Sequence, residues 1–285
     1  ARRCRSGRAA APLLQAYVEG TGILYGYNLH ANGILQHLLH YEGNGPQMLL
    51  IPGITSPAIT WGFVAERLSE RFDVHVLDVR GRGLSQAGDL DYSLDAMAAD
   101  AAAVVKAAGL KKPVVLGHSM GARIAIRAAR GNEAVFGGLV LVDPPVSGPG
   151  RPAYPSPWPW YEDSIVMSQK GCTGEDMKAF CPTWTEEQLR LRAEWLRTCQ
   201  LDAIRIAYDG FQTDDIHGDL PHLKLPMRLV VAGDAPVIGD DDVTEIKGLA
   251  PHMEIRTVAG AGHMIPWDNM DGFLDAVMDF NTVPA

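Results

Sequence analysis

Gly117-His118-Ser119-Met120-Gly121 is the stretch of this 285-residue chain with the clearest chemical character. It follows the short, largely β-branched run 113–116, typical of a buried strand, and precedes the Ala- and Arg-rich segment 122–130, typical of a helix. A serine flanked by two such glycines at a strand-to-helix turn is held in a strained backbone conformation with its hydroxyl exposed. The pattern predicts that Ser119 is a nucleophile.

A serine hydroxyl is a weak nucleophile at neutral pH, so it needs a base that takes its proton and an acidic residue that orients the base. Of the nine histidines, His263 is the predicted base. It lies in the Gly-rich loop 259–266, which follows the last expected strand, and such a loop can bring the imidazole over the serine. His118 is adjacent to the serine in sequence, so we expect its side chain to point elsewhere.

The acidic partner has three candidates. Asp143 ends the expected strand 138–143, at the edge of the sheet where the serine also lies. Asp234 and Asp240 flank the loop after the next strand, where this acid is more commonly found, but the usual acidic slot of that loop holds Pro236. We predict Asp143, with Asp234 and Asp240 as the alternatives. In a purely structural role, Asp143 would cap the turn into the prolines that follow it.

Two backbone N–H groups are needed to bind the negative charge that develops on a carbonyl oxygen under attack. Met120 is the first predicted donor, because it begins a helix whose N-terminus favours negative charge. Ile54 is the second, in the loop after the expected strand 47–52.

Strands and helices alternate along most of the chain, which predicts a mostly parallel sheet covered by helices on both faces. The first two strands are joined by the turn Ala31-Asn32-Gly33 and should form an antiparallel hairpin, in which we expect His37 and His40 to face solvent. The expected strands are 23–28, 35–41, 47–52, 72–78, 113–116, 138–143, 227–232 and 253–258, and the expected helices are 60–71, 92–108, 122–130, 241–249 and 270–280. The fold class is therefore α/β, with eight strands.

Residues 147–220 differ in character from the rest and predict a helical cap inserted after the sixth strand. The segment opens with a stretch rich in proline and aromatic residues and contains four of the six tryptophans. Helical stretches follow near 175–180, 185–199 and 201–211, and Thr185 with Gln188 fits a capping box. Residues 20–146 and 221–285 then form the core, and the basic segment 1–19 is expected to be a disordered arm.

Composition excludes several classes of function. The net charge of −9 argues against a nucleic-acid-binding surface. No apolar run reaches the length of a membrane span. The four cysteines form no C-x-x-C motif and no zinc-binding spacing with histidine, which favours a reducing cytoplasm. We expect a cytoplasmic protein without a metal or cofactor.

With these residues identified, the chain from about residue 31 onward resembles the α/β-hydrolase superfamily. The similar stretches are 52–68, 77–85, 117–123, 141–150, 191–196 and 261–268. The resemblance implies the triad Ser119, Asp143 and His263. The loops 54–61 and 143–150 are the most specific. They point to a branch that removes the formyl group of a small anionic amide in aerobic nicotinate degradation, through a formyl-serine intermediate.

A substrate carboxylate would need a donor near Ser119. The candidates are Thr55, Ser56, Arg192, His217 and Arg123, each weighed against a structural ion pair or hydrogen bond. Arg80 and Arg82 are expected to brace their own loop. The cap tryptophans are interpreted more readily as core than as walls of a substrate site.

Two other functions remain open on the sequence. One is a carboxylesterase or carbon–carbon-bond hydrolase that acts on another small carboxylic acid derivative with the same triad. The other is a catalytically silent receptor or scaffold, for which a damaged triad would be typical. Assays with different substrates separate the first from deformylation.

Overall fold

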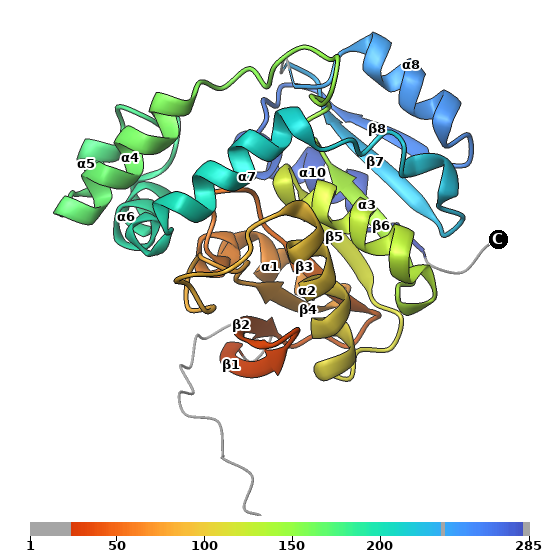
Figure 1. Cartoon of the computed structure of the whole chain (residues 1–285), viewed down its shortest axis with the longest axis horizontal. Coiled ribbons are helices and arrows are strands. Elements are labelled where there is room, and N and C mark those ends of the chain that lie inside the picture. Colours follow the sequence, from red (N-terminus) through yellow and green to blue (C-terminus); the bar gives the residue numbers. More distant parts are fainter. Residues whose placement is uncertain (1–23, 235–236, 282–285) are drawn as a thin grey trace, which may run out of the picture.

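A computed structural model describes residues 24–234 and 237–281 of the chain (Figure 1). The segment 1–19, for which the sequence predicts a disordered arm, lies outside the described residues. No helix in the described ranges is long and apolar enough to cross a membrane.

The centre of the molecule is one eight-stranded sheet. Its strands are β1 (Leu24–Ala31), β2 (Ile34–Tyr41), β3 (Gln47–Ile51), β4 (Asp73–Leu77), β5 (Val114–His118), β6 (Gly138–Val142), β7 (Met227–Ala232) and β8 (Glu254–Val258). They lie in the order β1-β2-β4-β3-β5-β6-β7-β8. Strands β1 and β2 are antiparallel to their neighbours, and the other six are parallel to one another. The predicted fold class is confirmed.

The turn of the first hairpin consists of Asn32 and Gly33, which have φ angles of 51° and 78°. Two consecutive positive φ angles are typical of a two-residue turn whose twist matches that of the strands, and Asn-Gly is the preferred pair for it. This turn fixes the register in which Ala31 faces Ile34 and Leu24 faces Tyr41.

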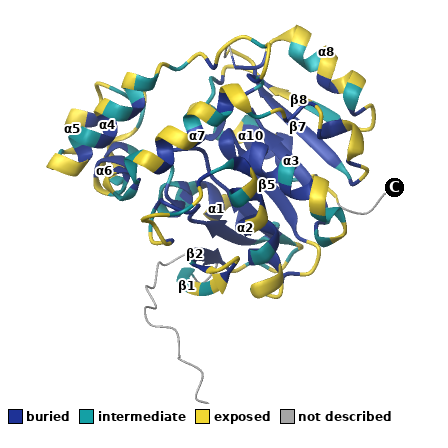
Figure 2. Cartoon of the chain, viewed as in Figure 1, coloured by how far each residue is buried: buried dark blue, intermediate teal, exposed yellow. Residues whose placement is uncertain are grey.

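Helices cover both faces of the sheet (Figure 1). Helices α2 (Leu94–Ala107), α3 (Met120–Asn132) and α8 (Asp240–Leu249) pack on one face. The 3₁₀ helix η1 (Ala58–Trp61) and helices α1 (Gly62–Ser69), α9 (Ile265–Asp268) and α10 (Met270–Val277) pack on the other. Two apolar clusters result, one on each side of the strands, while the outer helix surfaces are exposed (Figure 2).

Between β6 and β7 the chain forms α4 (Trp158–Lys170), α5 (Gly174–Met177), α6 (Glu186–Trp195), η3 (Leu196–Thr198) and α7 (Leu201–Thr213). The first three lie together at one side of the molecule, and α7 leads back toward the sheet (Figure 1). Helix α6 begins with the capping box predicted at Thr185 and Gln188. Helix α4 was not predicted, because it begins within the proline-rich stretch; Pro159 is tolerated there because it lies in the first turn.

The prediction that His37 and His40 face solvent is wrong, since both are buried. Leu38 and Leu39 project from the two faces of β2 and belong to the two apolar clusters, so both faces of this strand are covered. Polar partners replace water there: His37 Nδ1 lies 2.7 Å from Asp78 Oδ2, and His40 Nε2 lies 2.5 Å from Asp73 Oδ1.

Helix α3 lies so close to β3 that replacing Gly121 by alanine should strongly destabilise the protein. A Cβ at this position would lie 1.9 Å from the carbonyl oxygen of Ile51, so the helix and strand would have to separate. We expect Gly121→Ala to lower the free energy of unfolding by about 3 kcal/mol or more, measured by urea denaturation.

Gly131, near the end of the same helix, is the matched control. A Cβ there meets no atom within 4 Å, so Gly131→Ala should raise the free energy of unfolding by up to about 1 kcal/mol. Equal effects of the two substitutions would contradict the close approach.

Candidate active site

The turn between β5 and α3 holds Ser119 in a strained conformation, with φ of 55° and ψ of −119°. A non-glycine residue adopts this backbone only when its surroundings enforce it. The flanking glycines allow the strand and the helix to approach, since a Cβ on Gly117 would lie 2.3 Å from the carbonyl oxygen of Gly121. The local structure predicted from the sequence is therefore present.

Three predicted residues meet at this turn. Ser119 Oγ lies 3.0 Å from Nε2 of His263, and His263 Nδ1 lies 2.7 Å from Oδ2 of Asp143. The Asp143 carboxylate is fully buried, and its Oδ1 also accepts a hydrogen bond of 3.4 Å from the backbone N–H of Ala232. This chain of contacts can take a proton from the serine and stabilise the imidazolium that forms.

The alternative acids lie elsewhere. Asp234 is exposed just after β7, and its backbone N–H donates to the carbonyl oxygen of Ala261. Asp240 is exposed at the first turn of α8. Of the three candidate carboxylates, only Asp143 contacts the imidazole of His263, so the geometry favours it.

His118 does not hydrogen-bond to Ser119 but contacts the loop that carries His263. Its Nε2–H donates to the carbonyl oxygen of His263 over 2.9 Å. Burial, with a smaller contribution from His263, lowers the pKa of His118 to about 3, so this imidazole is neutral. His118 therefore fixes the backbone of the His263 loop without adding a charge beside the triad.

The predicted oxyanion donors are Met120, which directly follows Ser119, and Ile54, which lines the cavity. Met120 is the first residue of α3, so its N–H has no acceptor within the helix. Ile54 follows β3 and lines the cavity in front of the serine. The buried Arg82 contacts both residues: its Nε donates to the carbonyl oxygen of Ile54 over 3.1 Å, and its Nη2 lies 3.6 Å from the sulfur of Met120. Arg82 thus holds the peptide that follows Ile54 and restrains the loop in which the Ile54 N–H lies.

Arg80 and Arg82 brace their own loop, as the sequence suggested. Arg80 forms a buried ion pair with Asp100, in which two nitrogen–oxygen distances are 2.5 Å. Arg82 donates to the carbonyl oxygen of Arg80 over 2.7 Å. Neither arginine lines the cavity beside Ser119.

A cavity of about 350 Å³ opens in front of Ser119 and His263. Three of the predicted substrate-binding residues line it: Thr55, Ser56 and Arg192. The cap contributes most of the remaining wall, through Tyr154, Ser156, Trp160, Tyr161, Phe180, Cys181, Pro182, Thr183 and Trp184. The exposed Asp268 is the one acidic side chain in the lining.

Two other candidates for substrate binding lie outside this cavity. His217 is buried in the segment after α7 and is not among the residues that line the cavity; the nearest charged partner of its Nδ1 is Asp215 at 3.9 Å. Arg123 is also buried away from the cavity, and its guanidinium donates to four backbone carbonyl oxygens, those of Pro145, Ser147, Gly210 and Asp214. Arg123 therefore links the segment after β6 to the end of α7.

Arg192 is a buried cation without a carboxylate partner among the described residues. Its guanidinium lies between two indole rings, 5.1 Å from the centroid of Trp160 and 5.6 Å from that of Trp184. Its one hydrogen bond there is a 3.5 Å contact from Nη2 to Thr55 Oγ1, and Nε has no partner. A buried guanidinium with unused donors is suited to binding an anionic group.

Tyr154 is a site residue that the sequence analysis missed. Its hydroxyl lies 3.4 Å from His263 Nε2 and 3.3 Å from the hydroxyl of Tyr161. Burial raises the pKa of Tyr154, so the phenol stays protonated and can donate a hydrogen bond. It lies in the irregular stretch before α4, where no periodicity or motif marks it. Trp160 and Trp184, interpreted as core, instead line the cavity.

Comparison with known proteins places this geometry in context. The model of the alpha/beta hydrolase family matches residues 48–276. The chain is 58% identical to N-formylmaleamate deformylase of Pseudomonas putida over 256 residues, 90% of this chain and 96% of that protein. A crystal structure of a serine-to-alanine variant of an N-formylmaleamic acid deformylase, also from Pseudomonas putida, is 63% identical with a TM-score of 0.87, covering 89% of this chain and 100% of the other.

More distant structures share the fold. The crystal structure of E-2-(acetamidomethylene)succinate hydrolase has a TM-score of 0.74 at 20% identity, covering 90% of this chain and 98% of the other.

The contact between Asp143 and His263 predicts which carboxylate is required for turnover. Asp143→Asn should reduce kcat for p-nitrophenyl acetate by about 10³- to 10⁴-fold, because the amide cannot stabilise the imidazolium. Asp234→Asn and Asp240→Asn, the matched controls, should retain nearly full activity. If kcat fell only in one of the control variants, that residue and not Asp143 would be the acid that orients His263.

Proposed function

Because the chain belongs to the alpha/beta hydrolase family, we propose that it performs the reaction named for its 58%-identical relative. In this proposal the protein is a serine hydrolase that cleaves the formyl amide of N-formylmaleamate, releasing maleamate and formate. The observation that carries the proposal is the combination, in one cavity, of a complete triad and the unpaired cation Arg192. A small substrate that is both an amide and a carboxylate needs both features.

In the first half of the reaction, Ser119 Oγ attacks the formyl carbon while His263 Nε2 takes its proton. The N–H groups of Ile54 and Met120 bind the oxyanion of the tetrahedral intermediate. His263 then donates the proton to the amide nitrogen as the carbon–nitrogen bond breaks. Maleamate leaves, and the formyl group remains as an ester on Ser119.

In the second half, water takes the position that the leaving group occupied. His263 removes a proton from the water as its oxygen attacks the formyl carbon. The ester bond breaks, Ser119 recovers its proton from His263, and formate is released. Throughout both halves, the buried Asp143 holds the His263 ring in place through Nδ1 and stabilises its positive charge.

In this proposal, Arg192 binds the substrate carboxylate. Its guanidinium is held between Trp160 and Trp184, so it is already oriented before substrate binds. The hydroxyls of Thr55 and Ser56 line the same cavity and supply further donors. Since Thr55 directly follows the oxyanion donor Ile54, binding of the carboxylate and positioning of the formyl oxygen are linked through one loop.

The proposed reaction predicts formate release from N-formylmaleamate by the purified protein. Because the nucleophile is a side-chain oxygen, Ser119→Ala should lower the rate by about 10⁴-fold or more, measured with a coupled formate dehydrogenase assay. Treatment of the wild-type protein with a chelator should leave the rate unchanged at 25 °C.

Hydrolysis of p-nitrophenyl acetate is the control for this assay. Hydrolysis of the ester without release of formate would support the catalytic triad but contradict N-formylmaleamate as the substrate. Other small amides and esters of carboxylic acids would then be the substrates to test.

Loss of the cation should affect anionic substrates selectively. Arg192→Met keeps much of the side-chain length but removes the charged hydrogen bonds, each worth about 1.5–3 kcal/mol, so kcat/KM for N-formylmaleamate should fall by roughly 10- to 150-fold. Hydrolysis of the uncharged ester should change less than about threefold.

Arg190, an exposed residue of the same helix that pairs with Glu187 and Glu194, provides the matched control. Arg190→Met should leave both activities unchanged. If Arg192→Met lowered the two activities equally, the role of Arg192 would be to stabilise the structure and not to bind the substrate carboxylate.

A further inference from the structure

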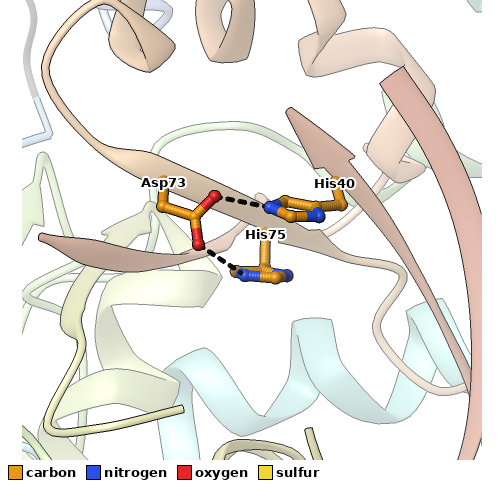
Figure 3. Close-up of side chains that lie close together, drawn as sticks. All are labelled: His40, Asp73 and His75. Carbon is orange, nitrogen blue, oxygen red and sulfur yellow. Dashed lines mark hydrogen bonds and ion pairs between the residues drawn. The ribbon is translucent and has the colours of Figure 1, made fainter. Parts of the chain in front are cut away.

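A second cluster of polar side chains, drawn in Figure 3, lies near the amino-terminal ends of the parallel strands, whereas Ser119 follows the carboxyl end of β5. It consists of His40 on β2 with Asp73 and His75 on β4. His40 and His75 are directly paired across the antiparallel strands. Asp73 precedes His75 by two residues and therefore projects from the same face. The sheet register, rather than a flexible loop, brings these three side chains together.

Both histidines direct the same ring nitrogen at one carboxylate (Figure 3). His40 Nε2 lies 2.5 Å from Asp73 Oδ1, and His75 Nε2 lies 3.5 Å from Asp73 Oδ2. The two imidazole rings are stacked, with centroids 4.0 Å apart and planes inclined by 11°. His75 Nε2 is buried, and within the described part of the chain it has no hydrogen-bond partner. A buried nitrogen of this kind calls for a ligand.

The opposite nitrogen of each ring is held by a tyrosine of β1. His40 Nδ1 lies 2.7 Å from the hydroxyl of Tyr25, and His75 Nδ1 lies 2.9 Å from the hydroxyl of Tyr27. Without an ion, His40 Nε2–H donates to the Asp73 carboxylate, and His40 Nδ1 accepts from the Tyr25 hydroxyl. Binding of an ion would displace the Nε2 proton, and Nδ1–H would then donate to the tyrosine oxygen while the Nε2 lone pair binds the ion. This arrangement is typical of histidines that bind a metal through Nε2 while an outer hydrogen bond sets the tautomer.

We propose that His40, Asp73 and His75 form a binding site for a divalent transition metal ion of the zinc class. Two imidazoles and one carboxylate are ligands that Zn²⁺ prefers, with water in the fourth position. The ligand atoms lie within 4.8 Å of one another. Ligands of a tetrahedral zinc ion with bonds of about 2 Å are about 3.3 Å apart, so side-chain movements of roughly 1 Å would close the site.

The Asp73 carboxylate is oriented before any ion binds. Besides its contacts with the histidines, Oδ1 accepts a 3.3 Å hydrogen bond from the backbone N–H of Gly43, in the loop after β2. The ion would therefore link β2, β4 and this loop. Through Tyr25 and Tyr27 it would also stabilise β1, the outermost strand of the sheet.

The position of the site separates it from hydrolysis. Asp73 is level with Gln47 at the start of β3, whereas Ser119 follows Gly117, which is level with Ile51 at the end of that strand. The two sites are thus separated by several residues along the strands, roughly 20 Å. The proposed ion supports the fold and takes no part in the chemistry at Ser119.

The direct test is a crystal of the chelator-treated protein soaked in ZnCl₂, with data collected at the zinc absorption edge. We expect an anomalous peak bonded to both Nε2 atoms and to Asp73. In solution, calorimetric titration with ZnCl₂ should show that one Zn²⁺ binds per protein chain and that binding saturates. Excess Zn²⁺ should raise the melting temperature of the protein by about 5 °C. The absence of a peak between these residues would overturn the proposal.

Variants identify the ligands in solution. Asp73→Asn and His75→Gln should each abolish the binding of one Zn²⁺ per chain and the rise in melting temperature. Retained hydrolysis of p-nitrophenyl acetate would show that each variant is folded. His30→Gln, which replaces an exposed histidine of β1, is the control and should retain both effects. If Asp73→Asn bound Zn²⁺ as tightly as the wild-type protein, or if His30→Gln lost as much Zn²⁺ binding as the ligand variants, the ion would be bound by surface histidines instead.

Discussion

The close approach of helix α3 to the sheet is the constraint on which the site depends. Gly121 lies against the carbonyl oxygen of Ile51, and this contact sets how sharply the chain turns between β5 and α3. The turn forces Ser119 to a φ of 55°, which a serine adopts at a cost of about 1–3 kcal/mol. The packing of the sheet and helix offsets that cost. In return, the same turn places the Met120 N–H beside the serine and leaves Oγ free to meet His263.

Around this turn, buried polar side chains hold the loops whose positions would otherwise vary. Arg82 connects the carbonyl oxygen of Ile54 to the side chain of Met120, and His118 binds the carbonyl oxygen of His263. In a low-dielectric interior such contacts are strong when they are satisfied and costly when one partner is lost. Burial lowers the pKa of Arg82 to about 10, which still leaves it charged at neutral pH. The loops that carry Ile54 and His263 are therefore held in place by Arg82, which lies outside the cavity, and by the neutral His118.

The sequence predicted what depends on local pattern and failed where tertiary context decides. Alternating strands and helices, the glycines around Ser119 and the capping box at Thr185 are local signals, and the eight-stranded fold follows from them. The burial of His40 depends on what packs against the two faces of β2, and the position of His217 depends on how the segment after α7 folds back. Tyr154 lies in a stretch with no periodicity, so only the three-dimensional structure brings it to His263. The roles of Ser119, Asp143 and His263 remain predictions, now with a geometry that supports them.

The proposed catalytic site and the proposed metal site lie at opposite ends of the parallel strands. At the carboxyl ends of the parallel strands, loops and the helices between β6 and β7 surround Ser119 and His263. Arg192 lies there beside two tryptophans and pairs with no carboxylate of residues 24–234 and 237–281. A buried cation without a carboxylate partner costs free energy, and in the proposed function the anionic substrate would relieve that cost on binding. At the opposite end, His40 and His75 face one carboxylate in a register fixed by the strands, with one nitrogen unused. In each place the chemistry of the side chains indicates the kind of ligand that we propose: an anion beside Arg192, and a cation between the histidines.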